Sequence, residues 1–277
     1  MNIINVFRVI AIALPLWGLG GSSFAQDDDF GMDFNLGVEK KIRPGMSFSI
    51  ESEARTQDNT RKMERWTLGG TFDMRLWQNA QKTFNVKASV GWKYMWRYNL
   101  KELEQKYGTS LDGDGNEMEY YKGYNEKEGY WRNRHRTSVS LGASYKLNKR
   151  WSLSLKETFQ FTHFCKGETH VNKYRVDDDE DWTKTVEEKQ YEPEDRSVLR
   201  SKLGVQYNIR HCPVNPYASV DYGCGLNYST SKWKFTAGTE INLSKQHKLD
   251  LFYRYITERD NEDPNGHLLG LGYNFKF

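Results

Sequence analysis

Apolar and polar residues alternate along most of the chain beyond residue 25. The segment 232–243 shows the pattern, with Trp233, Phe235, Ala237, Ile241 and Leu243 on one face and Lys232, Lys234, Thr236, Glu240 and Asn242 on the other. Alternation with a period of two is typical of a β-strand that has one apolar and one polar face. The pattern occurs in the segments 30–42, 46–56, 64–77, 84–99, 132–147, 151–166, 198–210, 217–228, 232–243, 247–258 and 267–277.

These segments are long for a soluble protein, whose strands average about five or six residues. A tilted strand that crosses a membrane needs about 9 to 11 residues. We therefore predict an all-β fold, a single antiparallel transmembrane β-barrel of about ten to twelve strands. Barrels of this kind normally have an even number of strands, whereas the pattern gives an odd number of segments. Either 30–42 is not a full strand or one strand escapes the pattern, and ten strands are slightly favoured.

Aromatic residues lie near the ends of the apolar faces, as in the interfacial girdles of membrane barrels. They are Trp66, Trp92, Trp96, Tyr145, Trp151, Tyr207, Trp233 and Tyr255. The alternative is that these rings fill the core of a soluble β-protein.

The links between segments alternate in length. Short turns occur at 78–83, 147–150, 210–216 and 243–247, and longer links at 57–63, 100–130, 166–196 and 259–266. Outer-membrane barrels have short periplasmic turns and longer external loops, so this alternation predicts the orientation, with the C-terminus on the periplasmic side.

Both ends of the chain carry features of an exported protein. Residues 1–25 contain Arg8, an apolar run over 9–19 and Ser23-Phe24-Ala25, which predict a signal peptide cleaved after Ala25 and a barrel domain over 26–277. An N-terminal membrane anchor is the alternative, although the apolar run is short. The last strand resembles the recognition signal that the barrel-assembly machinery reads in bacterial outer-membrane proteins, through Leu269, Leu271, Tyr273, Phe275 and the terminal Phe277. We therefore expect a location in the outer membrane, with its lipids and the assembly machinery as partners.

Composition narrows the function classes. Forty basic and 37 acidic residues give a net charge of +3, which provides no strong field for nucleic acid. The mean hydropathy is −0.84, and no apolar stretch beyond the N-terminus reaches the length of a membrane-spanning helix. The 40 aromatic residues exclude pervasive disorder. Cys165, Cys212 and Cys224 lack the close spacing of a metal site, so we expect neither a metal nor another cofactor.

If the apolar faces meet lipid, the opposite faces line the lumen. The candidate lumen residues are Arg65, Asp73, Lys93, Arg97, Arg132, Arg134, Arg136, Arg200, Lys202, Asp221, Lys234, Glu240 and Arg254. The basic excess, with the run Arg132, Arg134 and Arg136 along one strand, predicts an electropositive constriction that favours small anionic solutes. An equally weighted alternative is that the charges pair across a nearly closed lumen, because side chains largely fill small barrels.

The long links are acidic. Residues 177–181 are five consecutive acids. In 112–117, the side chains that carry oxygen atoms are spaced as in a calcium-binding loop, but Gly123 occupies the position of the Glu that completes such a loop. We predict solvated acidic loops. Glu157 falls on an apolar face, which predicts a bulge or register shift in its strand.

A lipid hydrolase is the remaining alternative. His135 and His163 are expected opposite each other on the lipid-facing side, with Thr137 and Cys165 two residues away. No Ser occupies the place of a nucleophile, so we interpret the histidines as interfacial and expect no enzyme activity.

Several segments resemble a known family. They are 30–41 (FGMDFNLGVEKK), 50–59 (IESEARTQDN), 64–66 (ERW), 134–141 (RHRTSVSL) and 154–163 (SLKETFQFTH). They are similar to the uncharacterised outer-membrane barrel family called domain of unknown function 2490, common in Bacteroidota. The resemblance implies a single outer-membrane barrel and brings no activity or catalytic residues. The sequence thus predicts a porin-like passive pore for small solutes. The second hypothesis is a closed barrel with a structural or surface-interaction role through its acidic loops.

Overall fold

The computed structural model describes residues 29–111, 117–176, 182–227, 231–258 and 265–277, so the expected signal peptide lies outside the described residues. All regular elements of this part are strands: β1 (Asp29–Arg43), β2 (Met46–Gln57), β3 (Lys62–Gln78), β4 (Phe84–Asn99), β5 (Glu102–Leu111), β6 (Glu117–Lys127), β7 (Tyr130–Lys146), β8 (Trp151–Phe164), β9 (Gly167–Val176), β10 (Trp182–Tyr191), β11 (Glu194–Tyr207), β12 (Val214–Gly225), β13 (Ser231–Asn242), β14 (His247–Glu258) and β15 (Gly266–Lys276). Among the described residues, no helix is long and apolar enough to cross a membrane.

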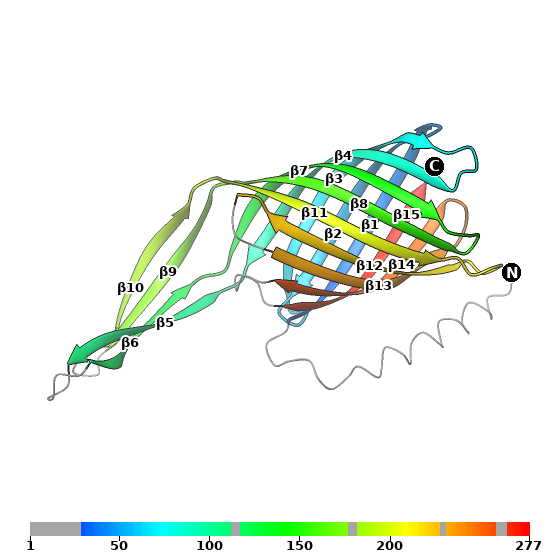
Figure 1. Ribbon diagram of the computed structural model, residues 1–277. Helices are drawn as coiled ribbons and strands as arrows, with labels where there is room; N and C mark the ends of the chain where they lie inside the picture. Colours follow the sequence, from blue (N-terminus) through cyan, green and yellow to red (C-terminus); the bar gives the residue numbers. More distant parts are fainter. Residues whose placement is uncertain (1–28, 112–116, 177–181, 228–230, 259–264) are drawn as a thin grey trace.

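Eleven strands form a closed barrel in the order β1-β15-β14-β13-β12-β11-β8-β7-β4-β3-β2 (Figure 1). Every neighbouring pair is antiparallel except β1 and β15, which run parallel from Asp29 opposite Gly266 to Glu39 opposite Lys276. The preference for ten strands was therefore wrong, and 30–42 lies within a full strand. The even-number expectation assumed antiparallel closure. In an up-and-down barrel with an odd number of strands, the first and last strands point the same way, and their parallel pairing leaves no open edge.

The barrel is apolar outside and polar inside. Leu36 on the outer face is 62% exposed, whereas the neighbouring inward Asp33 is 1% exposed. Pairs of aromatic side chains lie at both ends of the outer face. At one end Trp66 packs with Trp96 and Tyr222 with Trp233, and at the other Trp77 packs with Phe84 and Trp151 with Tyr207. This is the arrangement of a barrel whose outer surface meets lipid between two interfaces.

Short turns close one end of the barrel, and the longer connections lie at the other. The chain turns at 44–45, 79–83, 147–150, 208–213 and 243–246 at the first end, where β15 also finishes. Because β1 is parallel to β15, it begins at the opposite end.

The two longest connections are strands rather than the expected loops. The hairpins β5–β6 and β9–β10 join through β6 and β9 into a four-stranded sheet, which projects as an arm beyond the barrel (Figure 1). In β10 the side chains from Trp182 to Gln190 are all exposed, so the strand has no buried face and no clear alternation. Both acidic stretches, 112–116 and 177–181, lie outside the described residues.

Strand β8 contains no bulge at Glu157. It pairs without interruption with β7 and β11, so the expected register shift was wrong. Glu157 faces outward and accepts a hydrogen bond of 2.6 Å from the hydroxyl of Ser201. This partner on the neighbouring strand lowers the cost of a carboxylate on an apolar surface.

Candidate functional site: a charged chamber in the lumen

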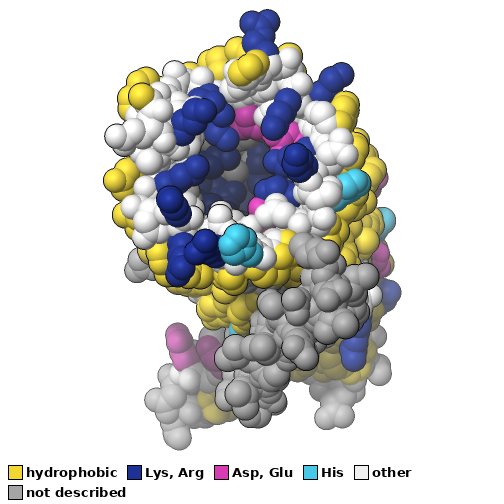
Figure 2. Space-filling model, turned by 90° about the vertical axis from the view of Figure 1, so that its right-hand side faces the viewer, with side chains coloured by type: hydrophobic (Ala, Val, Ile, Leu, Met, Phe, Trp, Pro, Cys, Tyr) yellow, Lys and Arg dark blue, Asp and Glu magenta, His cyan; other side chains and the backbone are white. Residues whose placement is uncertain are grey.

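A cavity of about 220 Å³ lies inside the barrel, surrounded by side chains from nine strands. Figure 2 looks into the end that carries the short turns and shows a hollow with Lys and Arg side chains around and within it. The charged lining consists of eight basic and two acidic residues: Arg55, Arg65, Lys93, Arg136, Arg200, Lys202, Lys234 and Arg254, with Glu53 and Asp221. We call this cavity the chamber.

Ion pairs organise the side of the chamber formed by β2, β3, β4 and β14. The carboxylate of Asp33 on β1 lies 2.8 Å from Arg55 and 3.3 Å from Arg254. Glu53 lies 2.6 Å from Arg65 and 3.3 Å from Arg55. Each of these cations therefore faces at least one carboxylate, which compensates for the loss of water around it.

A β-bulge adds a further carboxylate to this side. Arg55 pairs with Arg65 across β2 and β3, but the next residue, Thr56, pairs with Met63, so Glu64 is the extra residue. The bulge turns Glu64 inward beside Arg65, and its carboxylate lies 3.6 to 3.7 Å from Arg65, Arg97 and Arg55. Bulges commonly redirect a side chain in this way.

On the opposite side, formed by β7, β11, β12 and β13, one of the chamber-lining residues is acidic. Asp221 is cross-strand neighbour to both Lys202 and Lys234. Arg200 binds both carboxylate oxygens of Asp221, and its Nε donates over 3.1 Å. Arg136 on β7 donates from Nε to the hydroxyl of Thr162 over 3.0 Å. Positive charge therefore exceeds negative charge on this side.

The structure brings eight of the candidate lumen residues to the chamber: Arg65, Lys93, Arg136, Arg200, Lys202, Asp221, Lys234 and Arg254. The others lie elsewhere. Arg97 pairs with Glu64, Asp73 accepts a hydrogen bond from Ser89, and Glu240 pairs with Lys248 at 2.6 Å.

Arg132 and Arg134 lie at the arm end of β7 and do not line the chamber. Arg132 donates to the backbone carbonyls of Cys165 and Glu192 over 2.9 and 2.7 Å. The ring of Phe164 lies 5.2 Å from the Arg132 guanidinium and 4.3 Å from that of Arg134. These two arginines thus fix the base of the arm through cation–π contacts and hydrogen bonds to backbone carbonyls.

Arg55, which lines the chamber, and Glu64, which lies beside it, were missing from the candidates. Arg55 continues the inward alternation of Glu51 and Glu53, so the period of the strand was sufficient to find it. Glu64 lies out of phase with the inward positions of β3 and turns inward only through the bulge, which no alternation predicts.

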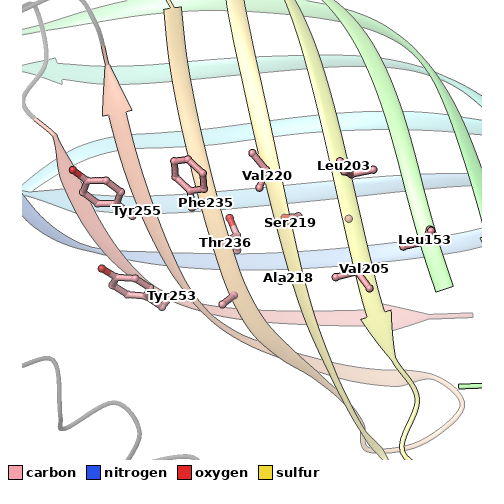
Figure 3. Close-up of a pocket in the computed structure, with 12 residues that line it drawn as sticks. Leu153, Leu203, Val205, Ala218, Ser219, Val220, Phe235, Thr236, Tyr253 and Tyr255 are labelled. Carbon is pink, nitrogen blue, oxygen red and sulfur yellow. The ribbon is translucent and has the colours of Figure 1, made fainter. Parts of the chain in front are cut away.

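An apolar depression of about 410 Å³ lies on the outer wall of the barrel. Leu203, Val220 and Phe235 line it on neighbouring strands (Figure 3), together with Leu153, Val205, Tyr253 and Tyr255. Its lining is almost entirely apolar, as expected for a surface that faces lipid.

His135 and His163 lie opposite each other on β7 and β8, as expected. The Nδ1 atom of His163 lies 2.7 Å from the carboxylate of Asp195 on β11. Within the described ranges, neither histidine is hydrogen-bonded to a Ser, Thr or Cys side chain, and no cluster of His, Cys, Asp and Glu has the makeup of a metal site.

Comparison with known proteins agrees with this architecture. No curated protein matches the chain. Among solved structures, the crystal structure of the beta domain of the Bordetella autotransporter BrkA is similar, with a TM-score of 0.44 and 12% identity over 86% of each chain. The family model described as outer membrane protein beta-barrel domain matches residues 115–277, more than half of the chain. The chain therefore belongs to the outer membrane protein beta-barrel domain family and is an outer-membrane β-barrel.

Proposed function

We propose that this barrel is a porin-like passive channel for small solutes, with a lumen that favours anions. The observation that carries the proposal is the chamber, whose lining has eight basic side chains against two acidic ones. In a narrow lumen with low-dielectric walls, an excess of one charge raises the local concentration of the opposite ion. A ring of Arg and Lys side chains acts in this way in anion-selective pores.

The size of the chamber limits the solutes. Its volume of about 220 Å³ lies below the range of about 300–1,000 Å³ typical of pockets for drug-sized ligands. The ion pairs of Arg55, Arg65 and Arg254 with Asp33 and Glu53 fix the side chains along one side. A rigid, narrow chamber of this kind favours inorganic anions and small carboxylates over larger nutrients.

Single-channel recording in a planar bilayer tests the proposal. The refolded barrel is expected to give discrete conductance steps, and Arg136→Gln is expected to reduce the chloride current, because it removes a cation from the less balanced side of the chamber. Glu240→Gln, which lies outside the chamber, serves as a control that changes lumen charge by the same amount in the opposite direction. A folded, heat-modifiable barrel that gives no steps contradicts the proposal.

A closed barrel that recognises a surface partner is the second candidate, and the arm favours it. Tyr107, Tyr121 and Trp182 are 56%, 43% and 54% exposed on the arm, and Tyr121 and Tyr124 lie 6.4 and 6.1 Å from Trp182 between ring centres. Exposed rings gathered in this way are typical of interaction surfaces. Removal of the arm separates the candidates: the channel keeps its conductance, whereas a recognition role is lost.

We also propose that the protein is not an enzyme, that residues 1–25 are a cleaved signal peptide, and that the assembly machinery inserts the barrel through its last strand. The resemblance to domain of unknown function 2490 of Bacteroidota is compatible with all three and assigns no solute.

A further inference from the structure

We propose that the β11–β13 side of the chamber is a binding site for a small, doubly charged oxyanion of the phosphate type. The site consists of Lys202, Lys234 and Ser219, with Arg136 on β7 of the same side of the chamber. This inference rests on the proposed channel function and names the class of solute that the channel holds.

The first argument is the difference in charge balance between the two sides of the chamber. On β2, β3, β4 and β14, the four lining cations all form ion pairs, and four carboxylates serve them: Arg55, Arg65, Lys93 and Arg254 with Asp33, Glu51, Glu53 and Glu64. On β7, β11, β12 and β13, the lining cations are Arg136, Arg200, Lys202 and Lys234, and Asp221 is the one acid among the lining residues of these strands. The excess of three positive charges therefore lies on one side.

The second argument is how Asp221 is used. It is the cross-strand neighbour of Lys202 on β11 and of Lys234 on β13, yet Arg200 binds both of its oxygens. Neither lysine takes part in any ion pair between described residues. Two ammonium groups thus flank a carboxylate that is already bound, and isolated buried cations are costly unless a counter-charge reaches them.

The third argument is independent of charge. Ser219, two residues before Asp221 on β12, lines the chamber and is 8% exposed. Its Oγ atom is buried and has no hydrogen-bond partner among the described residues. Buried hydroxyl groups are nearly always hydrogen-bonded, so an unsatisfied hydroxyl on a residue that lines a cavity points to a ligand atom. A hydroxyl donates well to an oxyanion oxygen.

These features select the ligand class. Three excess cations match a doubly charged anion better than a halide, and the phosphate group of a monoester carries about 1.5 to 2 negative charges at neutral pH because its second pKa is about 6. Its oxygen atoms can accept hydrogen bonds from Lys202, Lys234 and Ser219 together. The volume of about 220 Å³ admits such an ion or a small phosphate ester.

Isothermal titration of inorganic phosphate into the full-length, detergent-solubilised barrel tests the site, with ionic strength held constant by sodium chloride. Wild type is expected to bind phosphate in preference to chloride. Lys202→Gln and Lys234→Gln are each expected to weaken binding about tenfold or more, because each removes a charged hydrogen-bond donor. Lys248→Gln is the matched control: it removes one lysine that is paired with Glu240 outside the chamber, and it is expected to change binding less than threefold.

Folding is checked by heat-modifiable gel mobility. Ser219→Ala provides a second, uncharged variant and is expected to weaken phosphate binding while the mobility is kept. Glycerol phosphate, titrated in parallel, distinguishes a site for the free ion from one for small phosphate esters; binding of either supports the oxyanion site.

The outcomes separate this inference from the proposed channel. Conductance steps without phosphate binding overturn the oxyanion site and leave the channel intact. Phosphate binding that needs Lys202 and Lys234, in a barrel without conductance, supports the site and overturns the channel. Equal loss of binding in Lys248→Gln and Lys234→Gln also overturns the site, because lumen charge alone then explains the binding.

Discussion

Asp33 is a carboxylate buried in the lumen, and its replacement tests the ion-pair network most sharply. It is 1% exposed, lies 2.8 Å from Arg55 and 3.3 Å from Arg254, and accepts a hydrogen bond of 2.8 Å from Asn35. Asp33→Asn keeps the shape but removes the charge. Arg55 retains Glu53 and Glu64, whereas Arg254 loses its carboxylate partner.

Breaking a buried ion pair by removing one partner costs about 3–5 kcal/mol. Because Arg55 keeps two carboxylate partners, we expect the free energy of unfolding to fall by about 3 kcal/mol, the lower end of this range. Urea titration of the refolded barrel in lipid vesicles measures this value. Asp58→Asn is the matched control, since Asp58 pairs with Lys62 at 3.1 Å on the surface and such exposed pairs contribute about 0–1 kcal/mol. A loss below about 1 kcal/mol in Asp33→Asn would refute the reasoning about the network.

Three further predictions follow from particular contacts. Gly270→Ala places a Cβ atom against the ring of Phe252 and is expected to destabilise the barrel by about 1–3 kcal/mol in urea titration, with recovery when Phe252→Leu is added. Ser201→Ala leaves the outward Glu157 carboxylate without its hydrogen-bond donor and is expected to destabilise the barrel. Glu157→Leu suits the lipid-facing surface and is expected to be neutral or stabilising. A barrel that is less stable with Glu157→Leu than with Ser201→Ala contradicts the outward placement of Glu157. Deletion of Phe277 is expected to reduce the heat-modifiable fraction recovered from outer membranes, and unchanged recovery argues against a terminal insertion signal.

The alternation predicted the strands well where each strand has one polar face toward the lumen and one apolar face toward the outside. The segment 84–99 coincides with β4, and the eleven segments correspond to the eleven barrel strands. The closure was mispredicted because parity depends on how β1 meets β15, a pairing between the two ends of the chain that no local pattern contains. The alternation did not predict the strands of the arm, because a strand such as β10 carries charged residues on both faces.

The chamber was predicted only in part. Alternation placed residues such as Arg136, Lys202 and Lys234 on inward faces, and the structure gathers them around one cavity. It did not indicate which charges pair, because partners such as Asp33 and Arg254 are 221 residues apart. The inward turn of Glu64 depends on a bulge, and the use of Arg132 in fixing the arm depends on a sheet that was not foreseen.

The reversal potential of the wild-type channel under a potassium chloride gradient tests the central claim most directly. An excess of positive charge in the chamber predicts a potential of the sign that indicates greater permeability to chloride than to potassium. It also predicts that the preference weakens in Lys202→Gln and Lys234→Gln, which remove charge from the chamber. A potential that indicates cation preference, or one that is zero and unchanged in these variants, contradicts the account.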